Sequence, residues 1–187
     1  MDSETLEGKL LIAMPGIGDP RFERALVLVC NHDPLYAMGV AVNQPVAGVT
    51  VPDLLRRLEV TPSLHAVADP VLIGGPVDRE RGFVLHTDDY LPEHSAAVMQ
   101  GVALSPNRDA LQILASPNGC PRHALLVLGY AGWGPGQLDE ELRRNVWLTC
   151  EADEELIFSS DHAGKWTRAL AKLGVDAGLL SAHAGRA

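Results

Sequence analysis

Short apolar runs, most of them ended by turn residues, alternate along the chain with segments of helical periodicity. Apolar runs that stop at Gly, Pro, Asn or Asp are typical of buried strands, and an apolar face repeated every three or four residues is typical of a helix. This pattern predicts strands over Leu10–Met14, Ala25–Cys30, Ala37–Asn43, Val71–Ile73, Gly82–His86, Ala97–Leu104, His123–Leu128 and Val146–Cys150, and helices over Thr50–Leu58, Ser105–Ala115, Gln137–Arg144 and His162–Leu173.

The helix predicted over Thr50–Leu58 has a recognisable start signal. Thr50 is a favourable N-cap residue, and Asp53 stands three positions later, as in a capping box. Pro52 fits the first turn, where a missing backbone N–H costs no helical hydrogen bond. The N-terminal end of this helix is therefore predicted more sharply than that of the others.

The order of the predicted elements favours an α+β fold. Strands and helices are mixed without the strict alternation that a doubly wound parallel sheet requires. The chain of 187 residues has the ordinary size of one domain and contains no internal repeat, low-complexity tract or charged linker. We therefore expect a single domain over residues 1–187.

The segment over residues 129–136 holds four glycines together with Tyr130 and Trp133. Glycine loses more backbone entropy on folding than any other residue, so the cluster indicates a backbone that turns sharply, packs closely or approaches a ligand. We interpret the segment as a turn in which the two aromatics either wall a site or plug the end of the core. Gln137 and Glu141 follow, one helical turn apart, and could both point back at this turn.

Two further loops carry candidate binding residues. The glycines of Gly74-Gly75-Pro76 either let backbone N–H groups converge on an anion or a carbonyl oxygen, or only permit a bend before the proline. Asn43 ends a predicted strand, where polar side chains often line sites and equally often form Asx turns.

His86 ends a predicted strand and is expected to face the pair Asp88-Asp89. The seven histidines include no i, i+4 pair that would place two metal ligands on one helix face. A metal site would have to be assembled in three dimensions, for instance from His32, His86 and Asp88, and the simpler interpretation is polar loop histidines. We expect no metal and no cofactor.

Composition and charge narrow the functional classes. Hydrophobic residues make up 47% and charged residues 21% of the chain, as in globular proteins. The net charge of −9 disfavours binding to nucleic acid or an anionic membrane, because phosphates are bound by clustered lysines and arginines. The three cysteines are too scattered for a disulfide framework, and neither a signal peptide nor an apolar run of membrane length is found. We expect a soluble, cytoplasmic protein.

Six motifs follow one another along nearly the whole chain: Gly8–Pro15, Asp19-Pro20-Arg21-Phe22, Asn43-Gln44-Pro45, Gly74-Gly75-Pro76-Val77, Leu85-His86 and Gly129–Gly134 with Gln137-Leu138 and Glu141. Together they resemble the AlgH/YqgE family of bacterial proteins. The resemblance implies a single α+β domain with a mixed, bifurcated and partly barrel-like β-sheet surrounded by helices. Members carry the label of transcriptional regulator, but no biochemical activity is established for the family, so the resemblance supplies no catalytic residues.

Three functional hypotheses follow. The first is a non-enzymatic binding factor with an indirect regulatory role, which captures an unknown partner protein or a small ligand. It is favoured because no phosphate-binding loop, dinucleotide fingerprint, zinc-protease motif or nucleophile elbow is found. Its candidate binding surface consists of Asn43, Gly74, Gly75, Pro76, His86, Tyr130, Trp133, Gln137 and Glu141.

The other two hypotheses have weaker support in the sequence. One is an enzyme of unrecognised type, such as a hydrolase, that uses His86 with Glu141 or with an aspartate near residue 88. The other is direct DNA binding, which the acidic charge and the lack of a basic helix-turn-helix disfavour. On the first hypothesis, Trp133→Ala should abolish binding and leave the fold intact, whereas loss of folding would place Trp133 in the core.

Overall fold

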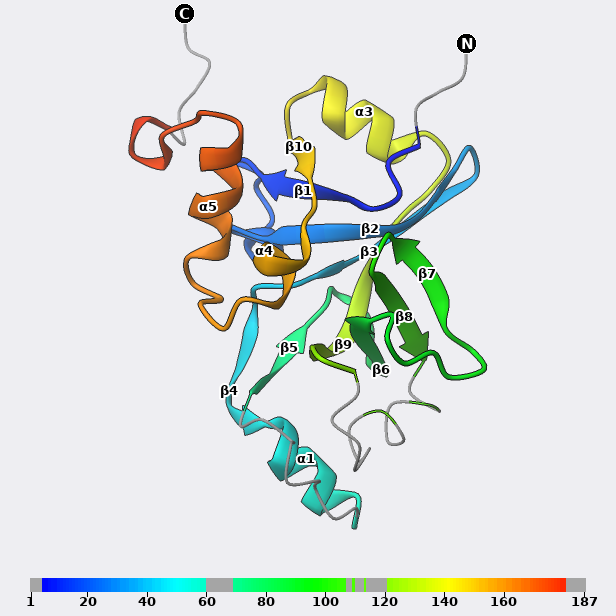
Figure 1. The fold of residues 1–187 in the computed structure, drawn as a ribbon. Coiled ribbons are helices and arrows are strands. Elements are labelled where there is room, and N and C mark those ends of the chain that lie inside the picture. Colours follow the sequence, from blue (N-terminus) through cyan, green and yellow to red (C-terminus); the bar gives the residue numbers. More distant parts are fainter. Residues whose placement is uncertain (1–4, 60–68, 107–108, 110–112, 114–120, 181–187) are drawn as a thin grey trace, which may run out of the picture.

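The computed structural model describes residues 5–59, 69–106, 109, 113 and 121–180. Strands dominate the fold, and the helices lie at the margins of the sheet (Figure 1). The strands are β1 (Lys9–Ala13), β2 (Leu26–Asp33), β3 (Tyr36–Ala41), β4 (Pro45–Thr50), β5 (Pro70–Ile73), β6 (Val77–Thr87), β7 (Ala96–Met99), β8 (Val102–Pro106), β9 (Ala124–Trp133) and β10 (Trp147–Glu151); the helices are α1 (Val51–Arg57), α3 (Gln137–Arg143), α4 (Glu154–Phe158) and α5 (Lys165–Lys172), with short 3-10 helices η1 (Pro20–Phe22) and η2 (Ala177–Leu179).

The strands form one mixed sheet that branches at β9. The main path runs β10-β1-β2-β3-β9-β6-β8-β7, with β4 and β5 outside it. One edge of β9 pairs with β6, and the other edge pairs with β5 in its first half and with β3 at its end. All strand pairs in the described part of the chain are antiparallel except β5–β9. The predicted α+β fold with a mixed, bifurcated sheet is therefore confirmed.

The barrel-like part of the sheet is curled but not closed. Val98 of β7 packs in the same core cluster as Leu10 and Leu28 of β1 and β2, although these strands lie far apart on the pairing path. The two end strands, β10 and β7, form no pair with each other within the described residues. The curl brings distant strands into one core while the two ends of the pairing path stay unjoined.

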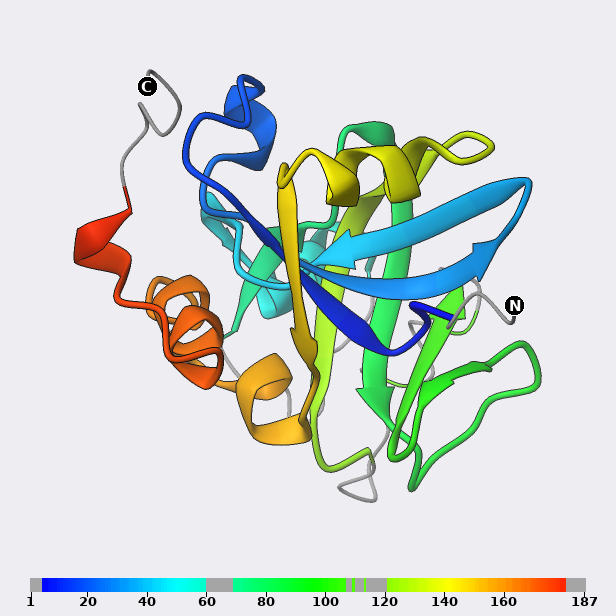
Figure 2. The ribbon, with the colours of Figure 1, turned by 90° about the horizontal axis from the view of Figure 1, so that it is seen from above.

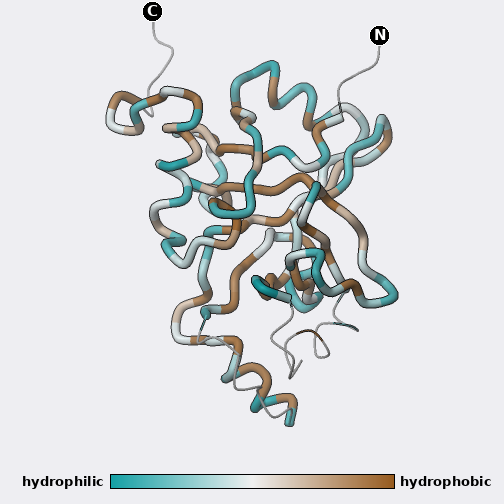
Figure 3. Tube along the Cα trace, in the orientation of Figure 1, coloured by the Kyte–Doolittle hydropathy of each residue, from teal (hydrophilic) through white to brown (hydrophobic). Residues whose placement is uncertain are grey.

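The core is divided among three clusters of buried side chains. The largest joins the sheet to α4 and α5, which lie together on one side of it, away from β7 and β8 (Figures 1 and 2). A second cluster packs the ends of β1, β2, β3 and β9 against α3, and a third lies under α1. The apolar positions follow the central strands, and polar positions gather in the outer loops (Figure 3). None of the helices in the described segments combines the length and apolarity needed to cross a bilayer.

Gly74 and Gly75 occupy the fork where β3 and β5 separate along β9. The Gly74 N–H donates to Leu128 O at 2.8 Å, and the Gly74 carbonyl accepts from Ala41 N at 2.7 Å, so this residue bridges two strands. A Cβ on Gly75 would lie 2.1 Å from the carbonyl carbon of Tyr130. Strand pairing uses the Gly74 N–H, which favours the structural interpretation of the Gly74-Gly75-Pro76 loop over a binding role for its backbone.

The glycine-rich segment after Leu128 is not a turn, as the sequence suggested, but the second half of β9. The strand continues to Trp133, and Gly129 has a positive φ of 73° where the backbone of Gly75 crosses it. Close backbone packing, one of the three reasons considered for the cluster, explains its glycines best. The turn comes later, at residues 134–136, immediately before α3.

Other elements agree with the sequence in part. The capping box is present, with Thr50 Oγ1 accepting from Asp53 N and Asp53 Oδ2 accepting from Thr50 N. The single strand predicted over Ala97–Leu104 is instead the hairpin β7–β8, which turns at Gly101 with a φ of 85°. The helix predicted from Ser105 lies mostly outside the described residues, and Ser105 itself belongs to β8. Strand β4 and helix α4 were not predicted.

The first residue of α5, Lys165, is a fully buried lysine that joins this helix to the sheet. Its ammonium donates to Val42 O at 2.8 Å and to Ile157 O at 2.6 Å, and lies 3.0 Å from His162 Nδ1. Burial, reinforced by the nearby Arg168, lowers the pKa of Lys165 to about 7. Burial and the charge of Lys165 likewise lower the pKa of His162.

We expect substitution of Gly75 by alanine to destabilise the fold strongly. The added Cβ meets backbone atoms of β9 that cannot move without breaking strand pairing, so the unfolding free energy should fall by about 3 kcal/mol or more. Gly134→Ala is the matched control, since its Cβ meets nothing nearer than Gln137 Oε1 at 4.0 Å. Urea denaturation of both variants measures the difference, and equal stabilities would show that the fork tolerates a side chain.

The unfolding free energy should rise with pH above about 7. The folded protein releases the Lys165 proton near pH 7, whereas the unfolded chain keeps it up to about 10.5, so the unfolded state binds more protons in this window. This group contributes a slope of at most about 1.4 kcal/mol per pH unit. Denaturation of wild type and Lys165→Met between pH 7 and 9.5 measures it, and parallel profiles would contradict the expectation.

Candidate functional site

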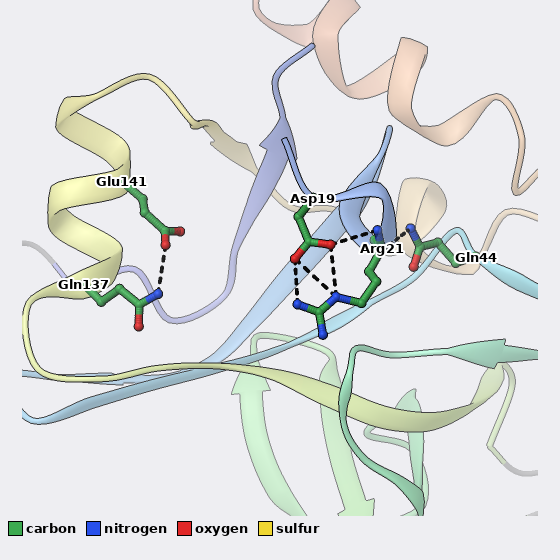
Figure 4. A network of polar contacts seen from close by, with 5 residues as sticks. All are labelled: Asp19, Arg21, Gln44, Gln137 and Glu141. Atoms are coloured by element: carbon green, nitrogen blue, oxygen red, sulfur yellow. Dashed lines mark hydrogen bonds and ion pairs between the residues drawn. The ribbon is translucent and has the colours of Figure 1, made fainter. Parts of the chain in front are cut away.

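A cavity of about 490 Å³ lies between the β1–β2 loop and helix α3. Figure 4 shows Asp19 and Arg21 of the loop on one side of this space and Gln137 and Glu141 of α3 on the other. The walls combine apolar side chains with five polar or charged ones. The lining residues are Ile17, Asp19, Arg21, Phe22, Pro76, Val77, Gly132, Trp133, Gln137, Glu141, Arg144, Val146 and Trp147.

The carboxylate of Glu141 is held by three N–H donors, all of them uncharged. Its Oε2 accepts from Trp133 Nε1 at 2.9 Å and from Trp147 Nε1 at 2.8 Å, and its Oε1 accepts from Gln137 Nε2 at 2.9 Å. A carboxylate offers about four acceptor positions, so one remains on Oε1. Gln137 is fixed in turn, because its Oε1 accepts from Gly134 N at 3.1 Å.

Both tryptophans that bind Glu141 are core residues. Trp133 at the end of β9 is 4% exposed, Trp147 at the start of β10 is 2% exposed, and their rings pack edge to face at 6.0 Å. Only the indole N–H groups are turned toward the cavity wall. We therefore expect Trp133→Ala to reduce stability, which corrects the sequence-based expectation that the fold would remain intact.

Arg21 is also held in place before any ligand arrives. Its Nε lies 3.0 Å from Asp19 Oδ1 and its Nη2 lies 2.7 Å from Asp19 Oδ2, while Gln44 Nε2 donates to Arg21 O at 3.1 Å (Figure 4). These bonds leave Nη1 unused. The hydrogen bond from Arg21 lowers the pKa of Asp19, so this carboxyl stays ionised and the pair stays charged.

The local sequence explains the shape of the loop that carries Arg21. Gly16 and Gly18 have positive φ values of 84° and 79°, which allow two tight changes of direction after β1. Asp19 then caps η1 by accepting from Arg21 N, and Pro20 occupies the first turn. The two glycines, the cap and the proline therefore fix the turn that carries Arg21 to the cavity.

Arg144 contributes a positive charge to the rim of the cavity. Its guanidinium makes no ion pair or hydrogen bond to any residue that the structure describes. The preceding residue, Arg143, differs in both respects: it pairs with Glu140 on the outer face of α3 and does not line the cavity. The two neighbours therefore provide a matched comparison.

The structure brings four of the predicted site residues together and separates the rest. Pro76, Trp133, Gln137 and Glu141 line the cavity, and Gln137 and Glu141 point back toward the end of β9 as the helix spacing suggested. Four others take structural positions elsewhere. Gly74 and Gly75 form the fork, Tyr130 packs edge to face on Phe83 at 6.2 Å, and Asn43 bonds Leu26 N and Arg24 O.

His86 lies apart from the cavity and does not face Asp88-Asp89. It is fully buried, with Nδ1 2.9 Å from Thr87 O and Nε2 2.7 Å from Ser105 Oγ. His86 pairs with Ala124 at one end of β9, about 30 Å along the strand from Trp133 at the other end. The proposed pairing of His86 with Glu141 in an enzyme site is therefore not formed.

The metal site considered from the sequence is also not formed. No group of three His, Cys, Asp or Glu side chains arranged to hold a metal occurs among the described residues. The Nδ1 atom of His32 instead accepts a hydrogen bond from Leu6 N at 3.3 Å, and its Nε2 atom lies 3.7 Å from Asp139 Oδ1.

Nine lining residues were missing from the predicted binding surface, and four of these carry polar or charged groups: Asp19, Arg21, Arg144 and Trp147. A signal existed for the first two, because Asp19-Pro20-Arg21 combines a cap, a first-turn proline and an ion pair within three residues. Nothing in the sequence places this loop opposite a helix more than a hundred residues further along the chain. Trp147 belongs to a run of residues typical of a strand, and that pattern gives no sign of a binding site.

Removal of the Glu141 carboxylate should destabilise the protein. In Glu141→Ala two indole N–H groups of buried tryptophans lose their acceptor, and the unfolding free energy should fall by about 2 kcal/mol or more. Glu140→Ala, at the exposed neighbouring position, should cost at most about 0.5 kcal/mol. Urea denaturation followed by tryptophan fluorescence makes the comparison. Similar losses in both variants would mean that the bonds to the indoles contribute little.

Comparison with known proteins places the chain in a family. A family model described as AlgH-like matches residues 10–178. A UPF0301 protein of Caulobacter vibrioides is 61% identical over 187 residues, which cover 100% of this chain and 96% of that protein. A UPF0301 protein of Ruegeria pomeroyi is 51% identical over 184 residues, covering 97% and 99%. The chain belongs to the AlgH-like family.

Solved structures show the same fold. The solution structure of the AlgH protein from Pseudomonas aeruginosa is similar with a TM-score of 0.77 and 35% identity, covering 100% of this chain and 98% of that one. A crystal structure of a Corynebacterium diphtheriae protein has a TM-score of 0.69 and 18% identity, covering 91% and 88%. At that identity the second likeness concerns the fold alone.

Proposed function

We propose that this protein is a non-enzymatic, cytoplasmic binding protein that holds a small ligand in the cavity between the β1–β2 loop and α3, and that any regulatory role is indirect. One observation carries the proposal. The Glu141 carboxylate lies on one side of the cavity and the Asp19–Arg21 ion pair on the other, and each is fixed by hydrogen bonds within the protein. Binding groups that are already ordered lose little entropy when a ligand arrives.

The size and lining of the cavity suit a small molecule. A volume of about 490 Å³ falls in the range of about 300–1,000 Å³ typical of ligand pockets. The few polar groups of such sites fix the orientation of the ligand, and the fixed polar side chains of this cavity could do the same. A partner protein remains an alternative that the experiment below distinguishes.

The other two functional classes have less support. An enzyme built on His86 and Glu141 would need the two side chains within hydrogen-bond reach, and they occupy different parts of the fold. Direct DNA binding would need a basic surface, against a net charge of −9. We therefore propose neither.

A thermal-shift screen against nucleotides, sugars, amino acids and other metabolites tests the proposal. A ligand at one hundred times its Kd adds about 2.7 kcal/mol of stability, which for a chain of this size raises Tm by about 5–10 °C. The shift should largely disappear in Arg144→Ala and persist in Arg143→Ala. A hit unaffected by Arg144→Ala would place the ligand elsewhere. If no small molecule raises Tm, and the wild-type chain captures a protein that Arg144→Ala does not capture, the occupant of the cavity is a protein partner and not a small ligand.

A further inference from the structure

We propose that the ligand of this cavity is a small zwitterion of the α-amino acid type, with an ammonium group on Glu141, a carboxylate on Arg144 and Arg21, and an apolar body between them. The inference rests on the proposed function and names the chemical class of its ligand. It follows from the charges that the cavity leaves without a partner of opposite sign.

The unpaired negative charge belongs to Glu141. Its three hydrogen-bond donors, two indoles and one amide, are all neutral, so they orient the carboxylate without cancelling its charge. The free acceptor position is on Oε1, beside Gln137 (Figure 4). A ligand ammonium placed there would provide the missing donor and the missing positive charge.

The unpaired positive charge belongs to Arg144. Asp19 neutralises Arg21, but no carboxylate among the described residues forms an ion pair with Arg144. Glu141 lies three residues before Arg144, the C-cap of α3, and forms no ion pair with it; its carboxylate binds the two indoles and the Gln137 amide instead. A ligand carboxylate could therefore bind Arg144 and the free Nη1 of Arg21 together, using the planar geometry that guanidinium groups offer to carboxylates.

A ligand with only one charge could pair with Glu141 or with Arg144, but not with both. It would desolvate the cavity and leave either Glu141 or Arg144 without a counter-charge, which is costly. Net-neutral ligands with both charges avoid this loss. The lining also includes five apolar side chains, those of Ile17, Phe22, Pro76, Val77 and Val146. They would accept an aliphatic or aromatic side chain.

The first experiment measures binding of the twenty free amino acids to the full chain by thermal shift and then by calorimetry. The best binder is compared with the analogue that lacks its carboxylate and the analogue that lacks its amine. For phenylalanine these are 2-phenylethylamine and 3-phenylpropionate. Each analogue should bind at least about tenfold more weakly than the amino acid, because each loses a hydrogen-bonded charge pair.

Variants assign each end of the ligand. Glu141→Gln keeps an acceptor for the indoles but removes the negative charge. It should therefore weaken binding of the amino acid at least about tenfold and leave binding of the carboxylate-only analogue nearly unchanged. Arg144→Ala should weaken binding of the amino acid and of the carboxylate-only analogue alike. Arg143→Ala is the matched control and should alter neither. Thermal unfolding of each variant without ligand verifies that it is folded.

The outcomes separate the two proposals. Equal binding of an amino acid and a single-charge analogue overturns the zwitterion. Binding of another class of metabolite, lost in Arg144→Ala, together with no binding of any amino acid, overturns the zwitterion and supports the proposed function. No binding of any small molecule overturns both.

Discussion

The sheet can branch at β9 only because the backbone of Gly74 and Gly75 lies directly against the backbone of that strand. At this point β5 leaves β9 and β3 takes its place, and Gly74 bonds to both sides of the gap. Any Cβ here would overlap backbone atoms, at 2.3 Å for Gly74 and 2.1 Å for Gly75. Backbone atoms in a hydrogen-bonded sheet cannot move aside as a side chain can, so the fork requires glycine. The absence of a side chain, which makes glycine unfavourable in an ordinary strand, is what permits this close approach.

The position of the candidate site follows from the same fork. Since β3 replaces β5 beside the last residues of β9, the strand continues far enough to place Trp133 under α3. Trp147 reaches the same point from β10, at the opposite end of the pairing path from β7. Glu141 therefore contacts side chains from β9 and β10 at the same time. Its carboxylate binds both indoles only if both strands are correctly placed. The rigidity of the site is a consequence of the core beneath it.

Local signals in the sequence predicted local structure well and long-range structure poorly. The apolar runs, the Thr50–Asp53 capping box and the helix over residues 137–144 depend on neighbours in the chain, and each was identified from the pattern. The glycines after Leu128 were interpreted as a turn because the residue that explains them, Gly75, lies more than fifty positions away. His86 illustrates the same limit. Its position at the end of an apolar run suggested a polar loop residue, whereas its hydrogen bond to Ser105 across the β6–β8 pair allows it to be fully buried.

The way in which Glu141 is held argues for recognition rather than proton transfer. A general base must offer a lone pair to the proton that it removes, within hydrogen-bond reach of the substrate. On Oε2 both positions are taken by indole N–H groups of buried tryptophans, and releasing either would leave an unpaired donor in the core. Only Oε1 keeps a free acceptor position, and this oxygen already accepts from the Gln137 amide. A carboxylate fixed in this way is well suited to accept a hydrogen bond of defined direction, and a site made of such groups selects a ligand by where its charges lie.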